Sequence, residues 1–110
     1  MKILKMEDMV GGWFVGGFEP VAYHTPDFEV GVKQFKKGED VEYHFHKEGT
    51  EVNYISKGKM KMHDKVLEKG DIFLLYPFEI TNPEFLEDTE IVVVKTVSNT
   101  KDKYVINIKN

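Results

Sequence analysis

The sequence predicts an all-β fold, an antiparallel β-sandwich or barrel with jelly-roll topology. Three observations support this fold class: about nine to eleven strand-length segments, turn signals at regular spacing, and the lack of any helical period. The chain has 110 residues, enough to bury a core without disulfides. We therefore expect one domain spanning residues 1–110.

The N-terminal quarter is predicted to contain only short extended pieces. Two Gly-Gly pairs and two prolines interrupt residues 1–27, which leaves room for strands near 13–15 and 21–23 but not for a helix. The aromatic side chains between these glycines are predicted to close one end of the barrel, and ligand stacking is the alternative. They are Trp13, Phe14 and Phe18.

The middle of the chain is predicted to form successive strands. Residues 28–35 alternate apolar and polar side chains, which is the period of a half-buried strand. Strands are also expected at 41–46, 51–56 and 59–63, and a tight hairpin turn at Gly58 joins the last two. Glycine suits this turn because it adopts positive φ without steric cost.

Side chains of the segment 59–63 are assigned to two faces by their alternation. Met60 and Met62 share one face and are predicted to fill the core, since methionine suits irregular apolar gaps. His63 shares the other face with two lysines, so we expect it in solvent. His24 lies in a Thr-Pro loop and is also predicted to be solvated.

Three strands are predicted in the C-terminal third, at 71–76, 91–97 and 104–108. The first is a continuous apolar run typical of a buried strand, and the second is rich in β-branched residues. Lys95 interrupts the second run. We predict that it lies on the outer face of that strand, and the alternative is a buried general base.

Two histidines and a glutamate mark the candidate site. His44 and His46 are two residues apart, so in an extended strand both imidazoles project from the same face. Glu51 follows a short polar segment whose glycine, Gly49, allows the chain to reverse and return a carboxylate towards them. Two imidazoles and one carboxylate can hold a metal ion and leave coordination positions open.

These residues resemble the first sequence motif of the cupin superfamily, in which glycines flank a His-x-His pair and a glutamate at fixed spacing. The matching residues are Gly38, His44, His46, Glu51 and Gly58. The resemblance implies a cupin-type antiparallel β-barrel, also called a double-stranded β-helix. It also implies that the cofactor is a divalent transition metal such as Fe, Mn, Ni or Zn, held by the two histidines and Glu51.

The second cupin motif is matched only in its first half. Gly70, Asp71 and Pro77 are in register, but Thr81 stands where the family places a further histidine ligand. That coordination position is therefore expected to be open, filled by water, or filled by Glu79. Glu79 lies two residues before Thr81 and shares its face if this segment is extended.

Composition excludes several other classes of protein. Cysteine is absent, so any metal must be held by nitrogen and oxygen. The net charge is -4 and all 15 basic residues are lysines, which argues against a nucleic-acid partner. No run resembles a signal peptide or a membrane span, so we expect a cytoplasmic protein with no membrane partner. Apolar edge strands at 91–95 and 104–108 predict a homodimer.

These features together predict a small metal-binding cupin that acts on or binds a small polar molecule, such as a sugar. Whether it is an enzyme stays open, because the resemblance admits isomerisation, epimerisation, decarboxylation and dioxygenation. Candidate acid-base groups are Glu79, Tyr54 and Glu42. One alternative is a cupin that binds a small ligand without a functional metal or turnover, and another is a purely structural protein with a vestigial His-x-His pair.

Overall fold

The structure, a computed structural model, describes residues 1–107, and these residues form an all-β jelly roll. The largest sheet has six strands in the order β2-β1-β3-β10-β5-β8. Its strands are β1 (Trp13–Gly16), β2 (Tyr23–His24), β3 (Glu29–Phe35), β5 (Glu51–Lys57), β8 (Ile72–Leu75) and β10 (Thr89–Lys95). The predicted fold class is confirmed.

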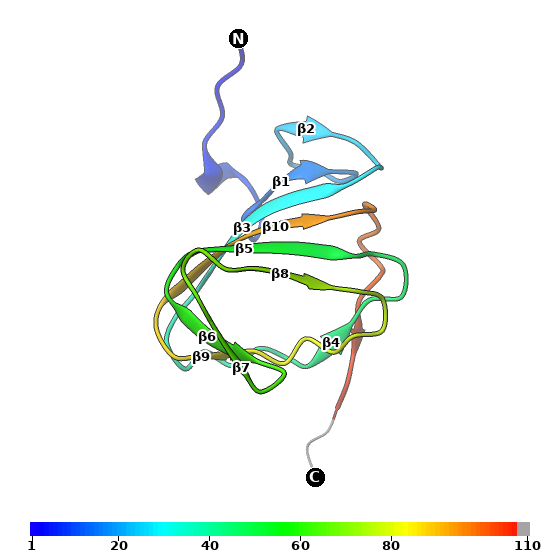
Figure 1. Ribbon diagram of the computed structural model, residues 1–110. Coiled ribbons are helices and arrows are strands. Elements are labelled where there is room, and N and C mark those ends of the chain that lie inside the picture. The colour runs from blue at the N-terminus through cyan, green and yellow to red at the C-terminus, as the bar shows by residue number, and fades with distance from the viewer. Residues whose placement is uncertain (108–110) are drawn as a thin grey trace.

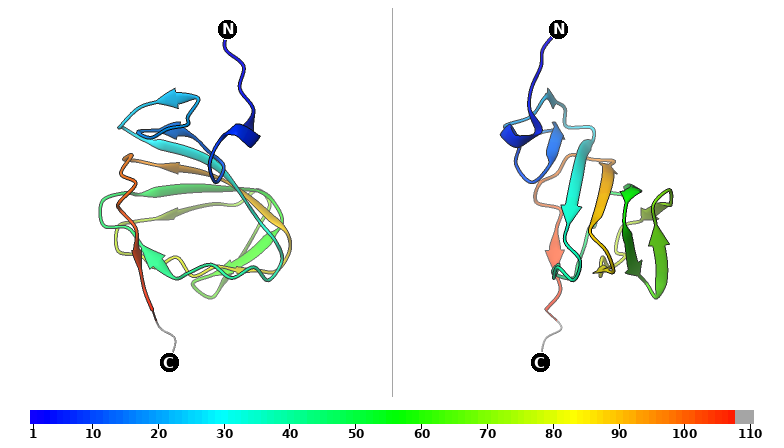
Figure 2. Two further views of the ribbon diagram at one scale, coloured as in Figure 1. Left: turned by 180° about the vertical axis from the view of Figure 1, so that it is seen from behind. Right: turned by 90° about the vertical axis from the view of Figure 1, so that its left-hand side faces the viewer.

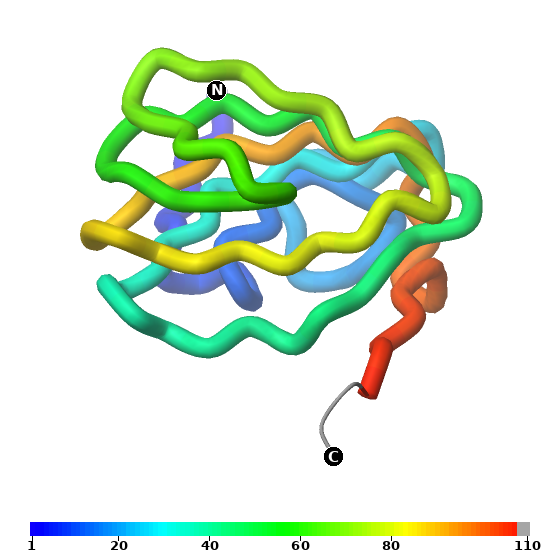
Figure 3. Tube along the Cα trace, turned by 60° about the horizontal axis from the view of Figure 1, so that its bottom comes forward, coloured from blue at the N-terminus to red at the C-terminus, as the bar shows by residue number. Residues whose placement is uncertain are grey.

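Two smaller sheets face this large sheet, as Figure 1 and the rear view in Figure 2 show. One has the order β7-β6-β9 and the other pairs β11 with β4. Their strands are β4 (His44–Phe45), β6 (Lys59–Met62), β7 (Lys65–Glu68), β9 (Glu84–Phe85) and β11 (Tyr104–Val105). Figure 3 shows the segments near residues 40–46 and 80–85 side by side, where His44 and Thr81 form an isolated bridge.

The apolar core lies between the large sheet and the sheet of β6, β7 and β9. Met60 and Met62 are buried there, as predicted, together with Ile55 and Phe85. The rings of Phe35 and Phe85 stack with centroids 4.3 Å apart. The opposite end of the jelly roll, near β4, carries the polar side chains of the candidate site.

The predicted hairpin at Gly58 is wrong. β5 pairs with β10 and β8, whereas β6 pairs with β7 and β9, so the chain turns a corner from one sheet into another. Gly58 does adopt positive φ, at 94°, and a Cβ added there would lie 2.2 Å from the Asp88 carbonyl oxygen. Glycine is therefore required at this corner by backbone conformation and by close approach.

β3 does not bury the face expected from its sequence. The alternation of residues 28–35 would place the apolar side chains inward. Glu29 and Gly31 are buried, while Phe28, just before the strand, is exposed. The reason is the register with β10, which places Glu29 opposite Lys95. The interior of this end of the molecule is polar, so the alternation identifies the strand but not its inner face.

Two further strand assignments are corrected. The predicted buried strand at 71–76 is β8, an edge strand with Ile72 65% exposed. The predicted edge strand at 91–95 belongs to β10, which lies between β3 and β5 in the large sheet. Both differences arise because an apolar run does not reveal its neighbours in a sheet.

The remaining differences concern short elements. β7 and β9 were not predicted, since β7 is mostly exposed and β9 has two residues. A single 3-10 turn, η1 (Met6–Asp8), occurs in the segment expected to lack helix. The last predicted strand is limited to β11, and its final position, residue 108, lies outside the described residues. Within residues 1–107, no helix has the length and apolar character needed to span a bilayer.

Candidate metal and ligand site

A pocket of about 300 Å³ lies between the sheets and has one apolar and one polar end. Core side chains such as Phe73 and Leu75 line the apolar end. The polar end is lined by His44, His46, Glu51, Asn53, Thr81, Lys33 and Lys103. All three predicted metal ligands therefore line the same pocket: His44 lies on β4, His46 follows that strand directly, and Glu51 begins β5.

His44 is fixed by its backbone and by one ring nitrogen. Its N–H and carbonyl pair with Thr81 at 3.3 and 2.7 Å. Its Nδ1 lies 2.9 Å from the Glu42 carbonyl oxygen, so an Nδ1 proton is donated there and Nε2 keeps a free lone pair. This is the arrangement that orients a metal-binding histidine.

His46 follows on the same face, as the two-residue spacing predicts. The ring centroids of His44 and His46 are 5.3 Å apart, and His46 Nδ1 lies 3.4 Å from Glu51 Oε2. In the part of the chain that the structure describes, no group of three His, Asp or Glu side chains is arranged so that it could hold an ion. The ligand set therefore stays a prediction, although its members share one pocket.

The protonation of these groups suits metal binding. Burial, reinforced by the positive charge of Lys95, lowers the pKa of His46 to about 4. Burial also lowers the pKa of His44, although the hydrogen bond to the Glu42 carbonyl opposes it. Both imidazoles are thus neutral at neutral pH, and the neutral form is the one that binds a metal. Burial raises the pKa of Glu51, and the charge of Lys95 opposes this.

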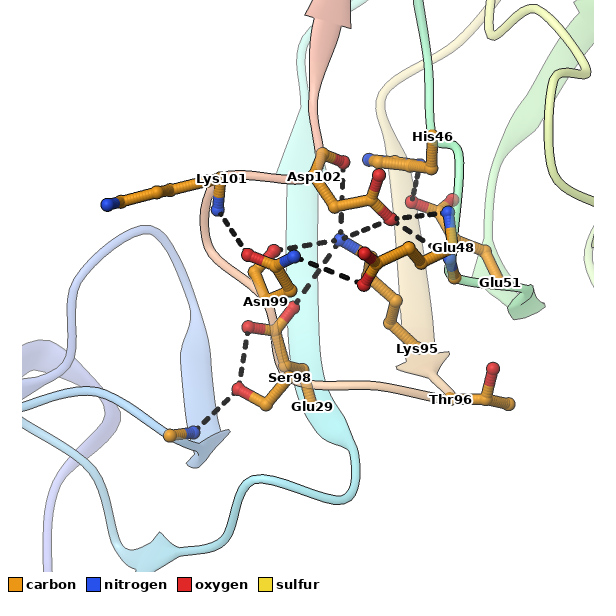
Figure 4. A network of polar contacts seen from close by, with 12 residues as sticks. Glu29, His46, Glu48, Glu51, Lys95, Thr96, Ser98, Asn99, Lys101 and Asp102 are labelled. Atoms are coloured by element: carbon orange, nitrogen blue, oxygen red, sulfur yellow. Dashed lines mark hydrogen bonds and ion pairs between the residues drawn. The ribbon is translucent and has the colours of Figure 1, made fainter.

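A buried network of charges, drawn in Figure 4, lies directly behind His46 and Glu51. At its centre is Lys95, only 5% exposed. Its Nζ lies 4.0 Å from Glu29 Oε1 and 3.9 Å from Asp102 Oδ2. The prediction that Lys95 lies on the outer face is wrong, because the register of β10 places it between Glu29 and Glu51 on the inner face.

Asp102 holds the loop that connects His46 to Glu51. Its carboxylate accepts backbone N–H groups from Lys47 at 2.7 Å, Glu48 at 3.1 Å and Gly49 at 2.9 Å. Burial acts to raise the pKa of Asp102, but these three hydrogen bonds and the charge of Lys95 together lower it. Asp102 is therefore an ionised anchor for the site loop.

Gly49 has a packing role as well as a role in the turn. A Cβ added to it would lie 2.6 Å from Lys95 Cε, so any side chain would displace the buried lysine. The sequence pattern did not identify this network or Asp102. Its partners lie 53 to 55 residues away along the chain, so no local pattern could have identified them.

The candidate acid-base residues do not converge on the pocket. Tyr54 is exposed on the outer face of β5, one residue from the inward Asn53. Glu79 is not among the lining residues, and its carboxylate accepts the Tyr76 N–H at 3.0 Å within a turn. Glu42 is exposed and contributes its carbonyl rather than its carboxylate to His44.

The other histidines lie away from the pocket. His24 and His63 are both exposed, as predicted, and the Nε2 of His63 contacts the Ile80 carbonyl oxygen. Thr81, by contrast, does line the pocket beside His44. Thr81, which stands where the second cupin motif has a histidine, thus lies at the site, while Glu79 is not among the lining residues.

Solved structures of other proteins share the fold of this chain. An uncharacterised protein with a double-stranded β-helix domain from Klebsiella pneumoniae aligns with a TM-score of 0.67 and 22% identity, over 74% of this chain and 71% of that one. KdgF from Halomonas sp. gives 0.62 and 21%, over 72% and 77%. An RmlC-like cupin from Ralstonia eutropha gives 0.59 and 18%, over 78% and 60%.

The class of protein defined by these comparisons is the cupin fold. This chain has that fold, which is also called the double-stranded β-helix and which the first sequence motif predicts. No family model matches the sequence, and no curated protein matches it significantly.

Proposed function

We propose that this protein binds a small polar molecule at a divalent transition metal held by His44, His46 and Glu51. The observation that supports the proposal most strongly is that two imidazoles of lowered pKa and a carboxylate line one end of a pocket of about 300 Å³. Bound there, the ion would supply Lewis-acid chemistry to an oxygen-bearing ligand.

The residues around the proposed ion prepare the site for it. The Glu42 carbonyl orients the ring of His44, and the Asp102 carboxylate fixes the loop after His46. Thr81 lies beside His44, and its hydroxyl is a poor ligand for a transition ion next to imidazole. A coordination position of the proposed ion would therefore stay open on that side. The pocket thus keeps room for a ligand at its polar end.

A second candidate is a ligand-binding protein that works without a metal. In this candidate His46 and Glu51, whose Nδ1 and Oε2 lie 3.4 Å apart, pair with each other instead of sharing an ion. The positions of Tyr54 and Glu79 outside the pocket favour binding over turnover. The two candidates differ in whether ligand affinity depends on metal.

Metal analysis tests the first candidate directly. Protein purified without a histidine tag should contain a transition metal, and calorimetry should show one zinc equivalent bound by the metal-free form. His44→Ala and His46→Ala should each abolish most of this binding. His24→Ala and His63→Ala are matched controls, since both side chains are exposed, and they should bind zinc normally. Wild-type zinc affinity in His44→Ala would refute the proposed ligand set.

A further inference from the structure

The polar end of the pocket carries more positive than negative charge. Lys33 and Lys103 line it, and Glu51 is its single carboxylate among the lining residues. Within residues 1–107, neither lysine lies within 4 Å of an Asp or Glu oxygen. Two ammonium groups and one carboxylate leave the described lining with an excess of positive charge.

Lys33 is held so that its ammonium group stays at the pocket. Its Nζ donates to the Gly11 carbonyl oxygen at 2.7 Å and lies 5.6 Å from the ring centroid of Trp13. One of three N–H donors is thereby used, and the others are left for a ligand. Burial lowers the pKa of Lys33, and so does the charge of Lys103, as expected for two cations that share a site.

Asn53 adds a neutral donor to the same end. It is 3% exposed and lines the pocket. The amide faces Glu51 and acts on it as a hydrogen-bond donor, which opposes the burial that raises the pKa of that carboxyl, and an amide carries two N–H donors. At least one N–H of Asn53 is therefore available to a ligand oxygen in the pocket.

The rest of the pocket is apolar. Trp13 and Phe73 line it and pack against the core, so a ligand must offer a hydrophobic surface beyond its charged group. The sequence contains no arginine, and bidentate clamping of a phosphate is typically arginine chemistry. Point charges and one amide suit a carboxylate better.

We propose that this pocket selects small organic carboxylates, with the anionic group held by Lys33, Lys103 and Asn53. The apolar body of the ligand lies against Trp13 and Phe73. The inference rests on the proposed function in that it places the small molecule in this pocket, but it does not require the metal.

A matched pair of ligands tests the charge requirement. Cyclohexanecarboxylate and cyclohexanecarboxamide have the same shape and differ in charge, and inorganic phosphate serves as an anion without an apolar body. Trp13 is the single tryptophan of the chain, so its emission reports binding at the pocket. The carboxylate should bind roughly tenfold tighter than the amide, and phosphate should compete weakly.

Variants then assign the charge to particular residues. Lys103→Met and Lys33→Met should each weaken carboxylate binding roughly three- to tenfold and leave amide binding unchanged. Asn53→Leu should also weaken carboxylate binding, because leucine has a similar size but no hydrogen-bond donor. Lys65→Met is the matched control because Lys65 is exposed on β7 and outside the pocket lining, and it should bind the carboxylate normally.

Several results would overturn the inference. These are equal affinity for carboxylate and amide, equal losses in Lys103→Met and Lys65→Met, tighter binding of phosphate than of the carboxylate, or no emission change up to the solubility limit of the carboxylate. The same proteins are titrated with zinc by calorimetry. Normal zinc binding without carboxylate preference removes this inference alone, and carboxylate preference without zinc binding removes the metal proposal alone.

Discussion

At the scale of single residues, burial keeps the imidazoles of the pocket neutral. The pKa of His46 falls to about 4 in the folded chain, while an unfolded histidine titrates near 6.5. Between these values the unfolded state binds a proton that the folded state does not. Folding therefore becomes less favourable as the pH falls from about 6.5 towards 4.

This difference predicts an acid-sensitive fold. In metal-free protein, the free energy of unfolding should drop by about 1 kcal/mol between pH 7 and pH 5 after allowance for partial solvent exposure. Asp102, whose pKa is lowered, adds a further loss only at more acidic pH. Urea titrations of the wild type and His46→Gln measure the effect. An equal pH dependence in the variant would contradict the assignment to His46.

Thr81 and Glu79 provide the second test at this scale. Thr81 lines the pocket next to His44, whereas the Glu79 carboxylate is engaged with the Tyr76 N–H. Thr81→His should therefore tighten zinc binding roughly tenfold or more, since even changes around metal ligands alter affinity 10- to 100-fold. Glu79→Ala should leave it nearly unchanged. Loss of zinc binding in Glu79→Ala, measured by calorimetry, would instead make Glu79 a ligand.

At the scale of secondary-structure elements, the loop after β4 depends on a segment that is distant in sequence. Asp102 is 2% exposed and satisfies three N–H groups of this loop as well as part of the charge of Lys95. Removal of the carboxylate leaves a buried cation and three backbone donors with fewer partners. Such losses in buried ion pairs are strongly destabilising.

We predict that Asp102→Ala lowers the free energy of unfolding by about 3 kcal/mol or more. Asp40→Ala, at an exposed position outside the named strands, should change it by no more than about 0.5 kcal/mol. Because the loop joins His46 to Glu51, the Asp102 variant should also bind zinc more weakly while still folded. Denaturant titration and calorimetry measure the two effects, and equal stability of the two variants would rule out the anchoring role.

The elements also show where sequence reasoning works and where it ends. The His-x-His spacing predicts that His44 and His46 share a face, because side-chain alternation is a local property of a strand, and both line one pocket with Glu51. The choice of sheet partner is not local. For that reason the sequence predicts a hairpin at Gly58, where the chain in fact turns a corner between sheets. It also predicts an outward Lys95, which Glu29 and Asp102 in fact enclose.

At the scale of the whole molecule, the outer face of the large sheet is apolar in its central rows and is exposed at β5 and β8. The cross-strand register aligns Val32, Val92, Tyr54 and Ile72 in one row and Val30, Val94, Val52 and Leu74 in the next. Tyr54 and Leu74 are each 41% exposed. Contiguous apolar surface of this kind marks an interaction site more often than a solvated face.

The structure therefore suggests a different contact surface for the predicted homodimer, a sheet face and not the edge strands expected from the sequence. The proposed edge at 91–95 lies inside the sheet, and the surface that needs covering is a face whose exposed part is formed by β5 and β8. Two copies related by a two-fold axis can each bury this face against the other, because an isologous interface uses the same patch twice. The face carries no charge within its two central rows, so self-association meets no repulsion there.

We predict that the protein is a dimer in solution through this face. Leu74→Lys and Ile72→Lys place a charge in the centre of the contact and should give monomers, because an unpaired charge buried in an interface is costly. Val66→Lys is the matched control, since Val66 is 58% exposed but lies on β7 in another sheet, and it should stay dimeric. Light scattering across a dilution series distinguishes the species. A monomeric wild type would exclude the dimer, and a dimeric Leu74→Lys variant would place the contact elsewhere on the molecule.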